Sequence, residues 1–125
     1  MNDSNLEKSD ELHLILNELK NKGKLEGVIF AYRDGGLVEE NLENQFDSQK
    51  FLSMSASVLE SAVGIGDTIG NQKIKKIIAE LAEKTILIFE CDDKTFLILI
   101  INKESNISYV FNKLEEFIEK ITILY

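Results

Sequence analysis

His13, Cys91 and Arg33 are the side chains in this sequence whose types could act chemically on a substrate. His13 is the only histidine and Cys91 the only cysteine. A catalytic triad needs a nucleophile, a base and an orienting acid together, and the helical segment around His13 supplies no such partners. Cys91 precedes Asp92 and Asp93, whose negative charges oppose thiolate formation. We interpret His13 as a solvent-facing residue and Cys91 as a small buried one.

Arg33 is the sole arginine and precedes a glycine turn. A side chain in such a place could act as an arginine finger that stabilises charge on a transferring γ-phosphate. Pairing with a neighbouring carboxylate is the more ordinary role, and we favour it. The glycines at 64, 66 and 70 follow a predicted helix, whereas a phosphate loop precedes one. We therefore expect no enzymatic activity, no cofactor and no metal.

The composition is typical of one globular domain. The chain has 125 residues, 44% of them apolar and 29% charged, with a formal net charge of −8. This charge repels nucleic acid and anionic membrane surfaces. A lone cysteine fits a reducing compartment, and no apolar run reaches the roughly 18 to 20 residues of a membrane span. We expect a cytoplasmic protein with a flexible segment 1–8 and one domain at 9–125.

Apolar periodicity predicts a helix near each end of the chain. Apolar residues recur at helical spacing from Leu12 to Leu19, with Ser4 or Ser9 as N-cap and Gly23 as the stop. A second amphipathic helix begins at residue 105 or 106. Its apolar residues, at spacings of three and four, are Ile107, Val110, Phe111, Leu114, Phe117, Ile118 and Ile121.

Four segments have the composition of β-strands. Leu25–Arg33 is β-branched and aromatic, and it runs into the turn Asp34-Gly35-Gly36. The return strand Leu37–Leu42 is polar, which suits a sheet edge. Thr85–Cys91 and Thr95–Ile101 are strongly apolar. We predict that these two are inner strands of a sheet that is covered on both faces.

A middle helix is unusually poor in charge. Asp47 can cap it, and it runs from Ser48 to Ile65 or beyond. Between residues 51 and 66 its only charge is Glu60. Beside the stripe that can lie on the sheet runs a second uncharged stripe: Met54, Val58, Ser61 and Ile65. Such a helix is expected to be covered on two sides.

The segment Lys73–Ala82 fits two structures. Its isoleucines and leucine recur at helical spacing, so periodicity alone favours a helix. The alternative is a lysine-bearing edge strand that pairs with Thr85–Cys91 through a tight turn at Glu83-Lys84.

The strand alternative produces a five-stranded sheet in the order 2-1-5-4-3, because polar strands belong at its edges. The first and third helices then cover one face, and the middle helix covers the other alone. One helix covers five strands poorly, and the third strand leaves an open edge. We infer a homodimer.

Three features carry a resemblance to a known family: Gly27-Val28 at the start of the first strand, the turn at 34–36, and the small-residue helix SMSASVLESAVGIG ahead of three strands and a final helix. With these features, residues 10 to 124 resemble the Roadblock family, which includes dynein roadblock-type light chains and MglB-type regulators. The resemblance implies a single-domain α/β (α+β) fold and favours a strand at Lys73–Ala82. It also implies dimers that join through the third strand and the second helix, and that bind Ras-like small GTPases or act as scaffolds.

We therefore predict a non-enzymatic homodimeric adaptor that binds and regulates or scaffolds a Ras-like small GTPase. The expected dimer interface is Met54, Val58, Ser61, Ala62, Ile65, Ile74, Lys76 and Ile78. The expected GTPase-binding residues are Ser53, Ser57, Glu60 and Ser61. The alternative is a ligand-sensing module with a PAS, GAF or profilin-like layout. That module needs a closed pocket in a monomer, and the densely apolar sheet offers no convergent polar groups for one.

Overall fold

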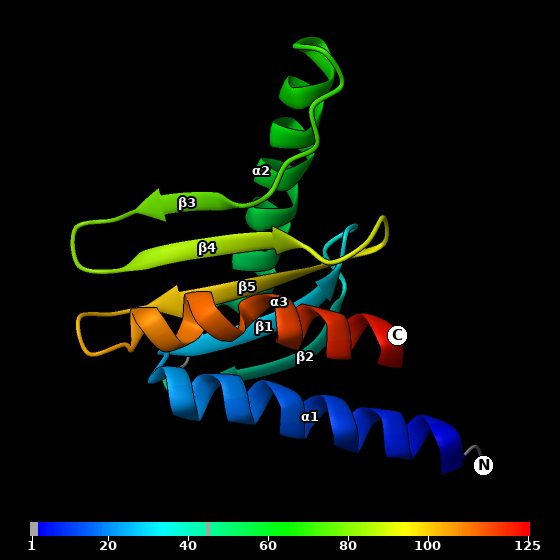
Figure 1. Ribbon diagram of the computed structural model, residues 1–125, viewed down its shortest axis with the longest axis vertical. Helices are drawn as coiled ribbons and strands as arrows, with labels where there is room; N and C mark the ends of the chain where they lie inside the picture. Colours follow the sequence, from blue (N-terminus) through cyan, green and yellow to red (C-terminus); the bar gives the residue numbers. More distant parts are fainter. Residues whose placement is uncertain (1–2, 45) are drawn as a thin grey trace.

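The computed structural model describes residues 3–44 and 46–125 as three helices and one antiparallel sheet (Figure 1). The sheet order is β2-β1-β5-β4-β3, which confirms the predicted order. Helices α1 and α3 lie on one face of the sheet and α2 lies on the other (Figure 1). In chain order the elements are α1 (Asp3–Gly23), β1 (Gly27–Tyr32), β2 (Leu37–Leu42), α2 (Ser48–Thr68), β3 (Ile77–Glu80), β4 (Thr85–Glu90), β5 (Thr95–Ile101) and α3 (Ile107–Leu124).

The two central strands are buried on both faces. All seven residues of β5 are buried, and β1 is buried from Gly27 to Ala31. Alternate side chains of β1 enter opposite cores: Val28 and Phe30 meet α1 and α3, while Ile29 and Ala31 meet α2. This explains why these strands are continuous apolar runs and do not alternate with polar residues.

Helix α1 begins earlier than the sequence suggested. It starts at Asp3, ahead of both expected caps, Ser4 and Ser9, and its leucines at positions 12, 16 and 19 are buried against the sheet and α3. It ends at Gly23 as predicted, where an added β-carbon would lie 2.9 Å from a methyl carbon of Val110 in α3. Residues 1 and 2 lie outside the described residues. The flexibility of segment 1–8 stays a prediction.

The β4–β5 hairpin is closed by Asp92. Its carboxylate accepts hydrogen bonds from the backbone N–H groups of Lys94 and Thr95, and from the Thr95 hydroxyl, at 2.8 to 2.9 Å. Burial alone would raise the pKa of this carboxyl, but the three hydrogen bonds together with the charge of Lys94 outweigh it, and the pKa is lowered. Asp92 is thus a turn residue.

Strand β3 confirms the edge strand and corrects its length. It spans only Ile77–Glu80 instead of Lys73–Ala82. The turn lies at residues 82 and 83, because the Leu81 N–H donates to the Lys84 carbonyl at 2.8 Å. The helical periodicity was misleading because Ile74, in the irregular segment before β3, packs into the core beneath α2. Ile74 lies three residues before Ile77, which is the same spacing as one further helical turn would give.

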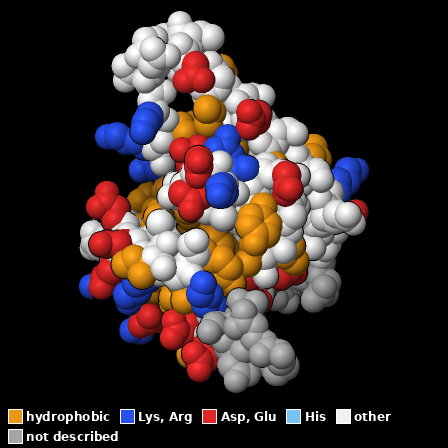
Figure 2. Space-filling view, turned by 90° about the vertical axis from the view of Figure 1, so that its right-hand side faces the viewer, with side chains coloured by type: hydrophobic (Ala, Val, Ile, Leu, Met, Phe, Trp, Pro, Cys, Tyr) orange, Lys and Arg blue, Asp and Glu red, His pale blue; other side chains and the backbone are white. Residues whose placement is uncertain are grey.

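Helix α2 is longer than the sheet is wide. The Asp47 carboxylate accepts from the Lys50 N–H and caps it, as predicted. Its 21 residues span about 32 Å, whereas five strands about 4.8 Å apart span about 19 Å between the outer axes. Its C-terminal end therefore extends beyond β3 (Figure 1) and forms the knob at the top of Figure 2. The helix reaches Thr68, beyond the minimum end predicted at Ile65.

Two helical glycines of α2 differ in their surroundings and form a matched test. A β-carbon at Gly66 would overlap the Gln72 carbonyl oxygen, so Gly66→Ala should lower the free energy of unfolding by about 1 to 3 kcal/mol. A β-carbon at Gly64 meets nothing within 4 Å, so Gly64→Ala should raise it by up to about 1 kcal/mol. Urea denaturation at one fixed protein concentration measures both. Wild-type stability in Gly66→Ala would contradict the close contact between Gly66 and the Gln72 carbonyl oxygen.

Candidate interaction surface on helix α2 and strand β3

Helix α2 presents three faces. The face on the sheet is buried through Leu52, Ser55, Ala56 and Leu59. The second face is apolar and exposed, and we call it the apolar face: Met54, Val58, Ser61 and Ile65. The third is polar, and we call it the outer face: Ser53, Ser57 and Glu60. Residues at spacings of three and four share a helix face, so each set follows from its sequence positions.

The apolar face has no cover within the described residues. Met54 is 61% exposed, Val58 47% and Ile65 63%. Ala62, predicted to share this interface, is half-buried at its border with the sheet. Contiguous exposed apolar side chains on a globular protein mark an interaction surface. The residues predicted for a dimer seam on α2 therefore lie together, and they are accessible.

The outer face is anchored through Arg33. The guanidinium of Arg33 donates to Glu60 of α2 at 3.0 Å and to Glu90 of β4 at 2.7 Å, and only 18% of the Arg33 side chain is exposed. A side chain held by two carboxylates is not poised to enter another protein's active site. Arg33 has the ordinary role that the sequence favoured, and it ties α2 to the sheet.

The Ser57 hydroxyl on the outer face donates to the carbonyl of Ser53 at 3.1 Å. This leaves a surface of small hydroxyl side chains with one carboxylate that already has a partner.

The predicted residues near β3 divide between the two faces of the sheet. Ile74 is half-buried among the core residues beneath α2. Lys76 lies on the opposite side, with its ammonium 4.8 Å from the ring centroid of Phe111 in α3. Ile78 is 49% exposed at the free edge.

A surface that the sequence analysis missed lies between α3 and β3. Phe111, one of the apolar residues at helical spacing in the predicted last helix, is 42% exposed, because α3 leaves the front of β3 uncovered (Figure 1). A cavity of about 440 Å³ opens here, lined by Lys75, Lys76, Phe89, Phe111, Asn112, Leu114, Glu115 and Ile118. In Figure 2, basic side chains gather beside apolar surface below the knob. The three lysines between positions 73 and 76 were the available signal.

Comparison with solved structures identifies the fold. Myxococcus xanthus MglB is 15% identical and superposes with a TM-score of 0.84 over 91% of this chain and 94% of that one. The Roadblock/LC7 domain from Streptomyces avermitilis is 9% identical, with a TM-score of 0.78 over 87% of this chain and 92% of that one. This chain has the Roadblock/LC7 fold.

A further Roadblock-fold structure, described as an MglB with a tetrameric arrangement, is 10% identical, with a TM-score of 0.86 over 94% of this chain and 89% of that one. The sequence itself matches no protein-family model and no curated protein. The likeness therefore rests on architecture: the sheet order and the placement of the three helices.

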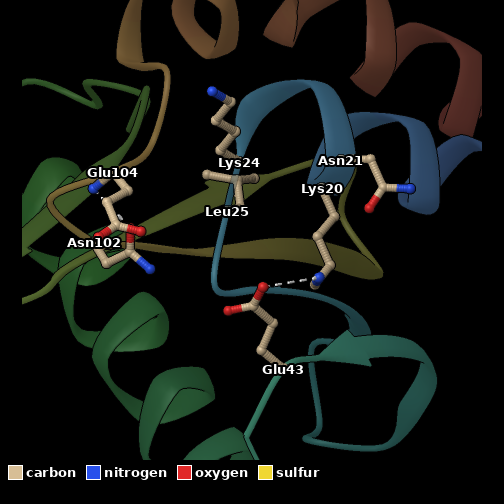
Figure 3. Close-up of a pocket in the computed structure, with 7 residues that line it drawn as sticks. All are labelled: Lys20, Asn21, Lys24, Leu25, Glu43, Asn102 and Glu104. Carbon is tan, nitrogen blue, oxygen red and sulfur yellow. Dashed lines mark hydrogen bonds and ion pairs between the residues drawn. The ribbon is translucent and has the colours of Figure 1, made fainter.

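Elsewhere the Roadblock fold of this chain offers no catalytic constellation among the residues described. The cavity in Figure 3 has a volume of about 280 Å³, and its charged pair is Lys20 with Glu43 at 3.8 Å. It opens at the surface and contains no nucleophile beside a base. His13 is half-exposed on α1 and lies 3.7 Å from Glu39.

The described part of the chain contains no candidate metal site and no helix that could span a membrane. No group of three or more histidine, cysteine, aspartate or glutamate side chains in residues 7–44 and 46–125 could hold a metal ion. None of the described helices is long and apolar enough to cross a bilayer.

Cys91 should be chemically inert in the folded protein. Burial raises the pKa of its thiol to about 12, with Asp92 and Glu90 adding to the effect. At pH 8 the folded protein should therefore react with a thiol reagent roughly a thousandfold more slowly than the chain unfolded in urea. Stopped-flow absorbance with Ellman's reagent measures both rates. Comparable rates would show that Cys91 is accessible as a thiolate.

Proposed function

We propose that this chain is a cytoplasmic, non-enzymatic homodimeric adaptor that binds and regulates or scaffolds a Ras-like small GTPase. One observation carries the proposal: α2 extends past the open β3 edge while its apolar face stays exposed. In a monomer this arrangement adds no stability, because the end of the helix covers no part of the chain's own hydrophobic core. In a dimer, the extended end of α2 and its apolar face would both be covered by the second copy.

The geometry favours a second copy at the β3 edge. A partner strand beside β3 would continue the sheet in the direction in which α2 already extends. The end of α2 would then lie over the partner's sheet, on the face that one helix covers poorly. By two-fold symmetry the partner's α2 would do the same, so the two helices lie side by side.

The apolar face supplies the contact between these helices. Met54, Val58 and Ile65 would be removed from water, at about 25 cal/mol per Å² of apolar area buried. Ser61 and Ala62 are small and allow the two backbones to approach closely. The set predicted from the sequence therefore suits a helix seam.

The GTPase would dock on the outer faces of the two paired helices. Ser53, Ser57 and Glu60 of the outer face, with Ser61 at its border with the apolar face, would form a wide and weakly charged surface together with their symmetry mates. The net charge of −8 favours a partner with a basic patch. The structural likeness to MglB and the resemblance to GTPase-binding Roadblock proteins support this partner class. The absence of a catalytic constellation in the described residues is compatible with an adaptor role.

Val58→Glu should convert the dimer to a monomer. Removing a carboxylate from water in an apolar seam costs several kcal/mol, so the dimer dissociation constant should rise at least about a hundredfold. Sedimentation equilibrium of wild type and variant measures the mass against 14.2 kDa for one copy. Leu14→Glu is the matched control, because Leu14 is 66% exposed on α1, away from the seam. A monomeric wild type at 100 µM would refute the proposed dimer.

Ser57→Arg should block GTPase docking and leave the dimer intact. A long charged side chain in the middle of the outer face should weaken binding at least about tenfold. Isothermal titration of each Ras-like small GTPase from the same genome, loaded with GTP or GDP, measures the affinity. Ser108→Arg on the exposed start of α3 is the control. A dimer that binds none of these GTPases would refute the adaptor role without affecting the assembly.

A further inference from the structure

The two helices on the α3 side of the sheet cover only part of it. α1 contacts β1 and β2 and packs against α3, and helices that pack side by side lie about 8 to 10 Å apart. The five strands span about 19 Å between the outer axes. The two helices therefore leave a strip roughly 10 Å wide in front of β3, which is about the width of one helix (Figure 1).

The strip is open because β3 adds nothing to the hydrophobic core on this side. Among the described residues, the core beneath α1 and α3 includes side chains of β4 and β5 but none of β3. Ile77 and Ala79 pack on the other side, beneath α2. The α3 side of β3 is therefore free for a further element to cover.

The cavity of about 440 Å³ lies in this strip, and we call it the α3–β3 groove. Its volume is within the range of about 300 to 1,000 Å³ that is typical of binding pockets. Phe89 of β4 and Leu114 of α3 are its most deeply buried lining residues. Phe111 and Ile118 also contribute apolar surface from α3. The groove thus offers an apolar base to an occupant.

The β3 side of the groove is basic, although the chain as a whole has a net charge of −8. Lys75 and Lys76 line the groove, and Lys73 is exposed just before them. Within residues 7–44 and 46–125, none of these three lysines takes part in an ion pair. The Lys76 ammonium lies 4.8 Å from the ring centroid of Phe111, a contact that leaves its N–H donors available. The α3 side of the groove contributes one carboxylate, Glu115.

We propose that the α3–β3 groove binds an amphipathic helix of a partner protein whose apolar stripe has acidic residues along one flank. The bound helix lies beside α3 and fills the open strip. Its apolar residues, at spacings of three, four and seven, contact Phe89 and Phe111. Its acidic flank faces Lys75 and Lys76, and its other flank is neutral or basic where it meets Glu115.

The charge distribution favours a short acidic helix over a broad anionic surface. A membrane or a nucleic acid would bring many negative charges against the remaining acidic surface of the chain, which repels them. A helix about as long as α3 presents its few carboxylates only to the lysines beside the groove. The partner is therefore a protein segment.

This site goes beyond the proposed function and does not depend on the homodimer. Every residue that lines the groove belongs to one chain. The groove lies on the α3 side of the sheet, whereas the proposed dimer seam and GTPase contact lie on α2. The partner helix and the GTPase can therefore bind at the same time.

A peptide library tests the chemistry of the occupant. The probe is a phage-displayed set of 14-residue helices with a fixed leucine and phenylalanine stripe, in which the flanking positions vary among glutamate, lysine and glutamine. Selection on the wild-type protein at 50 mM NaCl should enrich glutamate on one flank only. No enrichment, or enrichment of sequences without glutamate, would overturn the proposal.

Point variants locate the binding site of an enriched peptide, labelled with fluorescein and measured by fluorescence anisotropy. Lys75→Glu should weaken binding at least about tenfold at 50 mM NaCl and less at 500 mM. Phe111→Gln should weaken it at least about fivefold at both salt concentrations, because the contact it removes is apolar. Lys103→Glu, on the exposed loop before α3, makes the same charge change outside the groove and should alter the affinity less than about threefold.

Val58→Glu separates this site from the apolar face of α2. The peptide should bind this variant as tightly as wild type, whether the variant is a monomer or a dimer, because the groove lies within one chain. Loss of binding in Val58→Glu with retention in Lys75→Glu would place the peptide on α2 and overturn the proposal. Co-sedimentation of the wild-type protein with vesicles containing 30% phosphatidylserine, abolished by Lys75→Glu, would overturn it in favour of a membrane surface.

Discussion

The antiparallel ladder between β1 and β5 is the constraint on which the rest of this structure depends. Six residue pairs, from Gly27 with Ile100 to Tyr32 with Thr95, join the first hairpin of the chain to the last. Both strands are buried on both faces, so their alternating side chains create one core beneath α1 and α3 and another beneath α2. β2 pairs with β1, and β4 pairs with β5. β3 pairs only with β4 and forms an open edge of the sheet.

Once residues 73–82 are taken as a strand, which the family resemblance favoured and periodicity did not, polarity predicts the sheet order and the helix placement, because it separates inner strands from edge strands. The apolar segments at 85–91 and 95–101 and the polar return strand at 37–42 admit few arrangements. Periodicity failed at β3, a strand of four residues preceded by irregular backbone that places Ile74 in the core. Strand and helix patterns cannot be distinguished over so short a stretch.

The candidate site was predictable in its composition but not in its layout. Helical spacing alone groups Met54, Val58 and Ile65 on one face, and the structure leaves that face exposed. The division of Ile74 and Lys76 between the two sides of the sheet depends on the irregular backbone that precedes β3, which the apolar pattern did not predict. The exposure of Phe111 likewise depends on where α3 lies across the sheet, which its amphipathic pattern does not specify.

The β1–β5 ladder also sets when this chain can fold. Gly27 pairs with Ile100, so the inner edge of β1 has no partner until the last strand has left the ribosome. The hairpin of β1 and β2 must wait, with its apolar faces exposed, while the whole middle of the chain is synthesised. Such long-range pairing slows folding and lengthens the period in which unpaired strand edges can aggregate. A chain that stops after β4 lacks β5, which contributes side chains to both cores, and so it cannot complete either one.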